Sequence, residues 1–86
     1  MGGLGRVLRQ IQERLPEGEK AGAMNAVVAM SGIGLSPGSL ELHASRDLPG
    51  GRALVFSHAD GHVAYYPESD QTEKFLPGEY EEMTGG

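Results

Sequence analysis

The central part of the sequence, from Leu40 to Tyr66, reads LELHASRDLPGGRALVFSHADGHVAYY. It contains three runs that are typical of strands: residues 39–45, 52–58 and 62–66. In the first run apolar and polar residues alternate, as they do in a half-buried strand, and the second run is rich in Leu54, Val55 and Phe56. Two turn signals, Pro49-Gly50 and Asp60-Gly61, separate these runs. Because such short turns join antiparallel neighbours, the pattern predicts a three-stranded antiparallel β-meander.

The turns also predict which residues share a face of this sheet. With Asp60 and Gly61 as the two loop residues of a type I′ turn, Val63 lies opposite His58 and Tyr65 opposite Phe56. Pairing Leu42 with Phe56 then gives a leucine-rich face, made of Leu40, Leu42, Ala44, Leu54, Phe56, Val63 and Tyr65. We expect this apolar face to be the core side of the sheet. The prediction depends on the register, because a one-residue slip would send the leucines of the first strand to the other face.

The opposite face has less charge than solvated faces usually have. It holds Glu41, His43, Ala53, Val55, Ser57, His62, Ala64 and Tyr66. Val55 beside Tyr66 forms an apolar patch, which is either an ordinary group of half-exposed residues or a contact surface for a partner or a second copy. In this register His43 and His62 are roughly 13 Å apart, too far to bind one zinc ion, and His58 lies on the other face.

The residues before the meander predict one or two helices. Leu4, Val7, Leu8, Ile11 and Leu15 form a stripe at helical spacing, which we expect to pack on the leucine-rich face, and Pro16 ends that helix. A second helix is predicted over residues 17–30, with Ala21, Met24, Val27 and Val28 as its stripe and Gly32 as a left-handed cap. The run 26–30 is also compatible with a buried strand.

The C-terminal segment, residues 67–86, is acidic. It holds six of the twelve acids and a single lysine, together with four large apolar residues: Phe75, Leu76, Tyr80 and Met83. Such a segment is either flexible and folds onto a partner, or it docks on its own sheet and completes the core with Phe75 and Leu76. A short helix near Pro77 is compatible with both alternatives. The sequence thus predicts an α+β domain over residues 1–66, followed by this segment.

Composition narrows the function. The chain has 86 residues, no cysteine and a formal net charge of −5, which disfavours direct nucleic-acid binding. No run is long and apolar enough for a membrane span, and we expect a cytoplasmic protein. The motif Gly34-Leu35-Ser36-Pro37-Gly38 matches a hydrolase nucleophile elbow, but a strand follows it where that motif requires a helix. No pair of carboxylates lies on a predicted rigid face, so we expect no enzyme activity, cofactor or metal.

These observations favour a small acidic interaction or regulatory protein, of the inhibitor or immunity type, that binds a partner protein with a basic surface. The residues that we expect to contact the partner are His43, Val55, Tyr66, Phe75, Leu76, Tyr80 and Met83. One alternative is a self-associating structural protein, a homodimer formed through Val55 and Tyr66. Another follows from Gly85-Gly86, which resembles the C-terminus of ubiquitin-like modifiers and sulfur carriers. That resemblance covers two residues and implies attachment through the terminal glycine.

Overall fold

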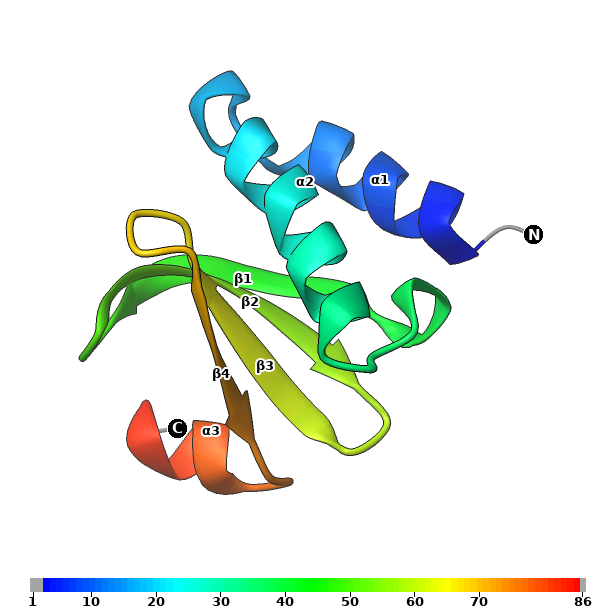
Figure 1. Cartoon of the computed structure of the whole chain (residues 1–86). Coiled ribbons are helices and arrows are strands. Elements are labelled where there is room, and N and C mark those ends of the chain that lie inside the picture. The colour runs from blue at the N-terminus through cyan, green and yellow to red at the C-terminus, as the bar shows by residue number, and fades with distance from the viewer. Residues whose placement is uncertain (1–2, 86) are drawn as a thin grey trace.

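The structure, a computed structural model, describes residues 3–85 apart from the side chains of Leu4 and Pro37. Figure 1 shows two helices on one side of an antiparallel sheet and a short helix on the other. The elements in chain order are α1 (Gly3–Arg14), α2 (Glu17–Gly32), a 3-10 turn η1 (Pro37–Ser39), β1 (Glu41–Leu48), β2 (Gly51–His58), β3 (Gly61–Tyr66), β4 (Gln71–Phe75) and α3 (Glu79–Met83). The predicted α+β class is confirmed, but the meander has four strands, in the order β1-β2-β3-β4.

The main core lies between α1, α2 and the face of the sheet that they cover, called the helix face below. Its buried residues are Val7, Ile11, Leu15, Ala23, Ala26, Val27, Met30, Leu40, Leu42, Leu54, Phe56, Val63 and Tyr65. The predicted packing of the α1 stripe on the leucine-rich face is therefore confirmed, except at Leu4, whose side chain lies outside the described part. Within residues 3–85 no helix combines the length and the apolar character needed to span a bilayer.

Helix α2 forms as predicted but presents a different side to the core. Of the expected stripe only Val27 is buried, while Met24 and Val28 are exposed. After Lys20 the helix carries no charged residue that would mark its outer side, so its periodicity could not select the inner face. The predicted cap is also displaced, since Gly32 still belongs to the helix and the positive φ, 91°, occurs at Gly34.

The hairpin between β2 and β3 closes one residue earlier than predicted. His58 pairs with Gly61, so the loop is residues 59–60, and Gly61, with a φ of 128°, begins β3. The pairing therefore shifts by two residues, and Val63 lies opposite Phe56 instead of His58. Because side chains alternate with period two, this shift leaves every side chain of β3 on its predicted face.

The hairpin between β1 and β2 has the expected loop, Pro49-Gly50, with Leu48 opposite Gly51. The pair Pro49-Gly50 suits the central positions of a type II turn, which requires a positive φ at Gly50, but the positive φ, 120°, occurs at Gly51, so that interpretation of the turn is wrong. Gly50 is needed for space instead, because a Cβ at that position would lie 3.0 Å from the ring of Tyr66.

Strand β1 contains a β-bulge that the period-two pattern does not reveal. Leu42 pairs with Phe56 as predicted, but Ala44 pairs with Val55, so the register shifts between Leu42 and Ala44. Ala44 therefore leaves the leucine-rich face, which corrects its predicted position. Beyond the bulge, β1 continues to Leu48, three residues past the predicted end at Ser45.

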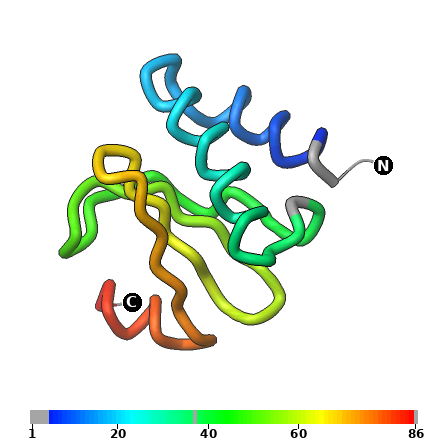
Figure 2. Tube along the Cα trace, viewed as in Figure 1, coloured from blue at the N-terminus to red at the C-terminus, as the bar shows by residue number. Residues whose placement is uncertain are grey.

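The C-terminal segment is built into the fold. Strand β4 pairs antiparallel with β3, from Tyr66 opposite Gln71 to His62 opposite Phe75. The chain then turns under the sheet, and α3 covers the face opposite α1 and α2, called the α3 face below. Figure 2, in the same view, shows the red C-terminal end on the far side of the sheet from the blue N-terminal helix.

Candidate functional site

The apolar patch expected on the second face of the sheet is covered by the chain's own C-terminal segment. A second buried cluster fills the α3 face and consists of Leu48, Ala53, Val55, Ala64, Tyr66, Phe75 and Tyr80. Val55 is fully buried and Tyr66 is 8% exposed, so the expectation that this pair forms an exposed patch is wrong. Phe75 supplies the apolar closure predicted for the tail, whereas Leu76 points to solvent.

The rings of His43, His62 and Tyr80 form one aromatic cluster on the α3 face. The ring centroids of the two histidines are 4.9 Å apart, and His62 stacks on Tyr80 at 4.6 Å. His43 meets Tyr80 edge-on at 5.3 Å. The predicted separation of roughly 13 Å between the histidines is therefore wrong, because the bulge and the two-residue shift bring them together. Arg46 also contacts Tyr80, with its guanidinium carbon 5.9 Å from the ring centroid.

The surroundings of His43 favour its neutral form. Burial lowers the pKa of His43 below its usual value, and the nearby His62 lowers this pKa further. The Nε2 atom of His62 lies 4.0 Å from a carboxylate oxygen of Glu81, and its Nδ1 is buried without a partner among the described residues. Within residues 3–85 no group of three or more His, Asp or Glu side chains is arranged to hold a metal ion. The cluster thus acts as a stacked contact that fastens α3 to the sheet.

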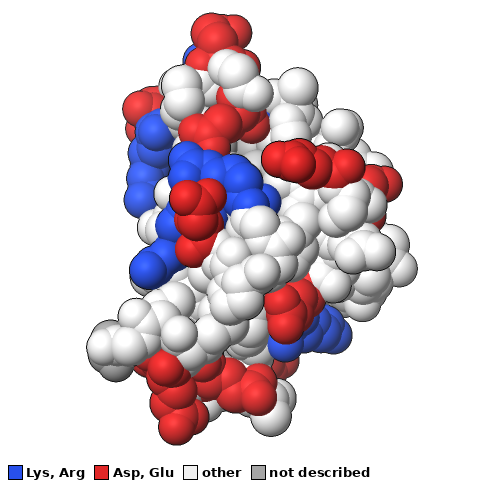
Figure 3. All heavy atoms as spheres, turned by 90° about the vertical axis from the view of Figure 1, so that its left-hand side faces the viewer, with Lys and Arg blue, Asp and Glu red and all other residues white. Residues whose placement is uncertain are grey.

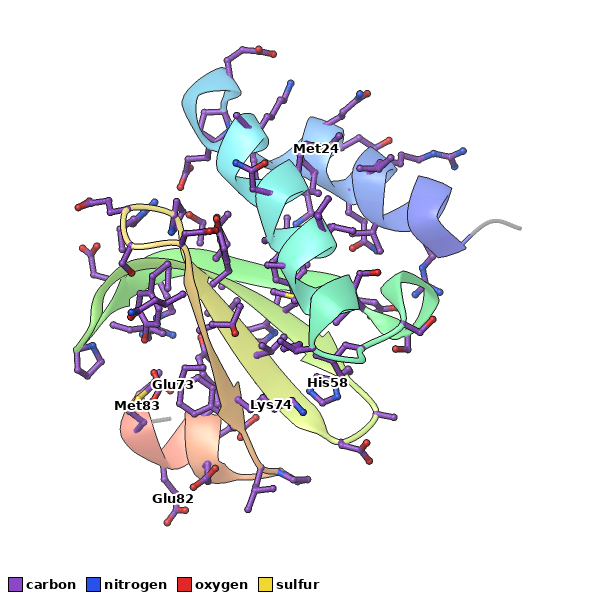
Figure 4. The ribbon with its side chains drawn as sticks, in the orientation of Figure 1. Met24, His58, Glu73, Lys74, Glu82 and Met83 are labelled. Carbon is purple, nitrogen blue, oxygen red and sulfur yellow. The ribbon has the colours of Figure 1, made fainter. Side chains whose placement is uncertain are left out.

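Two of the predicted contact residues are exposed at the end of the chain. Leu76, in the turn between β4 and α3, is 67% exposed, and Met83, in the last turn of α3, is 37% exposed. Figure 4 shows Glu82 and Met83 on α3, below the strand that carries Glu73 and Lys74. Leu76 and Met83 therefore lie at the end of the molecule that carries α3 with its three glutamates, Glu79, Glu81 and Glu82.

The acids of the C-terminal segment, together called the acidic side below, lie in the turn before β4, within β4 and on α3. Its members are Glu68, Asp70, Glu73, Glu79, Glu81 and Glu82. With Lys74 as the only cation among them, residues 67–86 carry the entire formal net charge of −5, and residues 1–66 are neutral overall. In Figure 3 one group of acidic side chains lies at the lower end of the molecule, where α3 lies in Figure 1, and further acidic side chains lie in the middle and upper parts.

Two tyrosines of β3 fix the position of this acidic side on the sheet. The hydroxyl of Tyr65 donates a hydrogen bond to Asp70 at 2.5 Å, and that of Tyr66 donates one to Glu73 at 2.8 Å. The hydrogen bond that Tyr65 donates to Asp70 is the main cause that raises the pKa of Tyr65 to about 12. Burial, with the bond to Glu73, raises the pKa of Tyr66 to about 12. Both carboxylates are thereby held in place while remaining on the surface.

Sequence reasoning missed one exposed feature, the outer side of α2. Met24 is 46% and Val28 is 72% exposed, and a hollow of about 420 Å³ lies beside them, lined by Asn25, Val28, Ala29, Tyr65, Pro67 and Asp70. The available signal was the absence of any charged residue from Ala21 to Leu40, which is unusual for a helix with a solvated side. Gly22 sits against Pro67, where a Cβ would approach that ring to 3.2 Å.

Comparison with known proteins adds no identity to this geometry: no family model, no curated protein and no solved structure matches the chain.

Proposed function

We propose that this protein is a small, non-enzymatic binding protein that acts by covering a basic surface of a partner protein with its acidic side. The observation that carries the proposal is the placement of the entire net charge in one folded segment. An acidic surface of this kind raises the association rate with a basic partner and disfavours acidic ones. The regulatory consequence would be that the partner's own basic site is occupied.

The distribution of cations supports this proposal. Arg6 pairs with Glu41, Lys20 with Glu17, and Arg52 lies 3.2 Å from a carboxylate oxygen of Glu19. Since these acids are matched, the charge that remains for a partner lies on the C-terminal segment. The exposed Leu76 and Met83 beside those acids would supply apolar contacts at the centre of such an interface.

A second copy of this chain is the weaker alternative, because the patch of Val55 and Tyr66 that would carry self-association is buried under α3. The carrier alternative depends on Gly86, which lies outside the described residues. A cytoplasmic setting, in which the partner would be met, remains part of the proposal.

The proposal is tested by reversing charge on the acidic side and comparing the proteins that are captured from cell extract. Glu68→Lys with Glu82→Lys changes two exposed acids that belong to no described ion pair. We expect at least one basic protein to be retained about tenfold less by this double variant than by the wild-type chain, as measured by quantitative mass spectrometry.

The control of equal charge is Glu13→Lys with Glu17→Lys, at the exposed junction of α1 and α2, which also removes the exposed ion pair between Glu17 and Lys20. It should retain the partner as the wild-type chain does. If the control loses the same proteins as the test variant, capture depends on the net charge of the protein and not on the position of the acids. If neither variant loses any protein, the acidic side is not the binding surface.

A further inference from the structure

The two edges of the sheet are treated differently by the rest of the chain. At the β1 edge, the backbone N–H of Leu42 donates to the side-chain oxygen of Gln10 at 2.8 Å. Arg14 donates to the carbonyl oxygens of Leu42 and His43. These backbone groups point away from β2, so two side chains of α1 take the part of a neighbouring strand. The first half of the β1 edge is closed.

The other edge, β4, is open. Alternate residues of an edge strand direct their N–H and C=O groups away from the sheet. Among residues 3–85 no backbone group or side chain bonds to those groups of β4, and the neighbouring α3 packs beneath the sheet on β3. Four of the five residues of β4 are exposed or half-buried. An open edge of this kind is a template for a further strand.

The charge around this edge specifies what could add to it. Glu68 and Asp70 precede β4, Glu73 lies within it and Glu79 follows it. We infer that the open edge of β4 binds an extended, basic segment of a partner protein as a fifth, antiparallel or parallel strand of this sheet. This inference rests on the proposed function and assigns its contact to the backbone of β4.

The two faces of the sheet give such a segment its side-chain pattern. Glu73 lies opposite Ala64 and so projects on the α3 face, where α3 adds its three glutamates. Lys74 lies opposite Val63 and projects on the helix face, beside a hollow of about 150 Å³ lined by Leu35, His58, Asp60, Lys74, Phe75 and Leu76. A matching strand therefore alternates basic residues toward the α3 face with apolar ones toward the helix face.

The same acids act against pairing with a second copy. Two β4 edges brought together antiparallel would place two segments of charge −5 side by side, and like charges across an edge are destabilising. The edge of β4 thus favours pairing with a basic strand and disfavours pairing with β4 of a second copy, so it can bind a partner without self-association.

The test uses the intact protein and a synthetic peptide that alternates lysine with valine over about nine residues, enough to span a five-residue strand and its flanks. Two kinds of peptide serve as controls. One has the same composition with lysines and valines in separate blocks. The other has the alternating sequence with N-methyl groups on alternate residues, which removes the N–H donors needed for strand pairing and keeps the charge. It is made in two versions, one methylated at the odd and one at the even positions, because only one of these sets faces β4. Affinity is measured by calorimetry, and exchange of the amide hydrogens of residues 71–75 by NMR.

We expect the alternating peptide to bind at least about tenfold more tightly than the block peptide. It should also bind at least about tenfold more tightly than whichever of the two methylated versions binds more weakly. Binding should slow amide exchange in β4. Glu73→Lys should weaken binding about tenfold, while the control Glu13→Lys on α1 should leave it unchanged within about twofold. Equal binding of all peptides, lost in Glu73→Lys, would retain the acidic side as the binding surface and overturn strand addition. If no peptide binds, the inference is overturned, while the proposed function is decided by the capture experiment above.

Discussion

At the scale of single residues, Gly61 is a position where the fold has no room for a side chain. It has a φ of 128°, and a Cβ there would lie 2.2 Å from the carbonyl oxygen of Phe75 in β4. We expect Gly61→Ala to lower the free energy of unfolding by about 3 kcal/mol or more, since it adds strain to a backbone clash. Urea unfolding followed by circular dichroism measures this loss.

The control for that substitution is Gly32→Ala, at the end of α2. A Cβ at position 32 meets no atom within 4 Å, so alanine should change stability by no more than about 1 kcal/mol, and in the stabilising direction. Equal losses for the two variants would contradict the packing described at the β3–β4 pair.

The tyrosines of β3 predict an alkaline limit to stability. In the unfolded chain tyrosine ionises near pH 10, whereas the pKa values of Tyr65 and Tyr66 in the fold are about 12. A raised pKa contributes stability that is present below pH 10 and is lost as the pH rises toward 12. Ultraviolet titration of tyrosinate should show two groups that ionise near pH 12, and the Tyr65→Phe, Tyr66→Phe double variant should show neither of them. Ionisation of all three tyrosines near pH 10 would contradict the two hydrogen bonds.

At the scale of elements, the docking of α3 should respond to acid. The groups around His43 are His62, Glu81, Arg14 and Arg46, and the pKa of His43 is lowered mainly by burial. Because the unfolded histidine has a pKa near 6.5 and that of His43 is lower in the fold, the stability that neutral His43 contributes is present above pH 6.5 and is lost as the pH falls below it. We expect unfolding in urea to become easier between pH 7.5 and 5.5, and less so in His43→Gln. The control His58→Gln, on the helix face, should keep the full wild-type change.

Helix α1 makes a second prediction at this scale. Replacing Gln10 and Arg14 by leucine removes the groups that bond to Leu42 and His43, and so leaves the partly buried backbone N–H and carbonyl of Leu42 unpaired. We expect a loss of about 1–3 kcal/mol and the appearance of dimers at high concentration, seen by light scattering. Arg9→Leu, on the exposed side of the same helix, should change neither; dimers in that variant would refute edge protection by α1.

The elements also show what the sequence could and could not predict. Helix α1 has charges on one side, so its buried stripe is found from spacing, whereas α2 is uncharged after Lys20 and its stripe is not. The turn glycines were recognised, but not which residue of each turn takes the positive φ. The bulge after Leu42 and the pairing of β4 depend on contacts between distant segments, and hence the histidine cluster was misplaced.

At the scale of the whole molecule, the charge distribution predicts the oligomeric state. Because residues 67–86 carry the whole net charge and include the open edge, we expect the intact chain to be a monomer at neutral pH and low salt. Near the isoelectric point of 5.0 the repulsion is lost and association should increase. Light scattering across this range checks both statements, and a dimer that persists at neutral pH would contradict them.

The pair of side chains by which α1 closes β1 has one more consequence. A sheet with two open ends can lengthen by adding copies without limit, as fibrils do, but here Gln10 and Arg14 already occupy the outward groups of β1 at Leu42 and His43. A strand that added along the whole of β1 would have to displace these two side chains, so joining of copies edge to edge is less favourable at β1 than at β4 and long polymers are disfavoured.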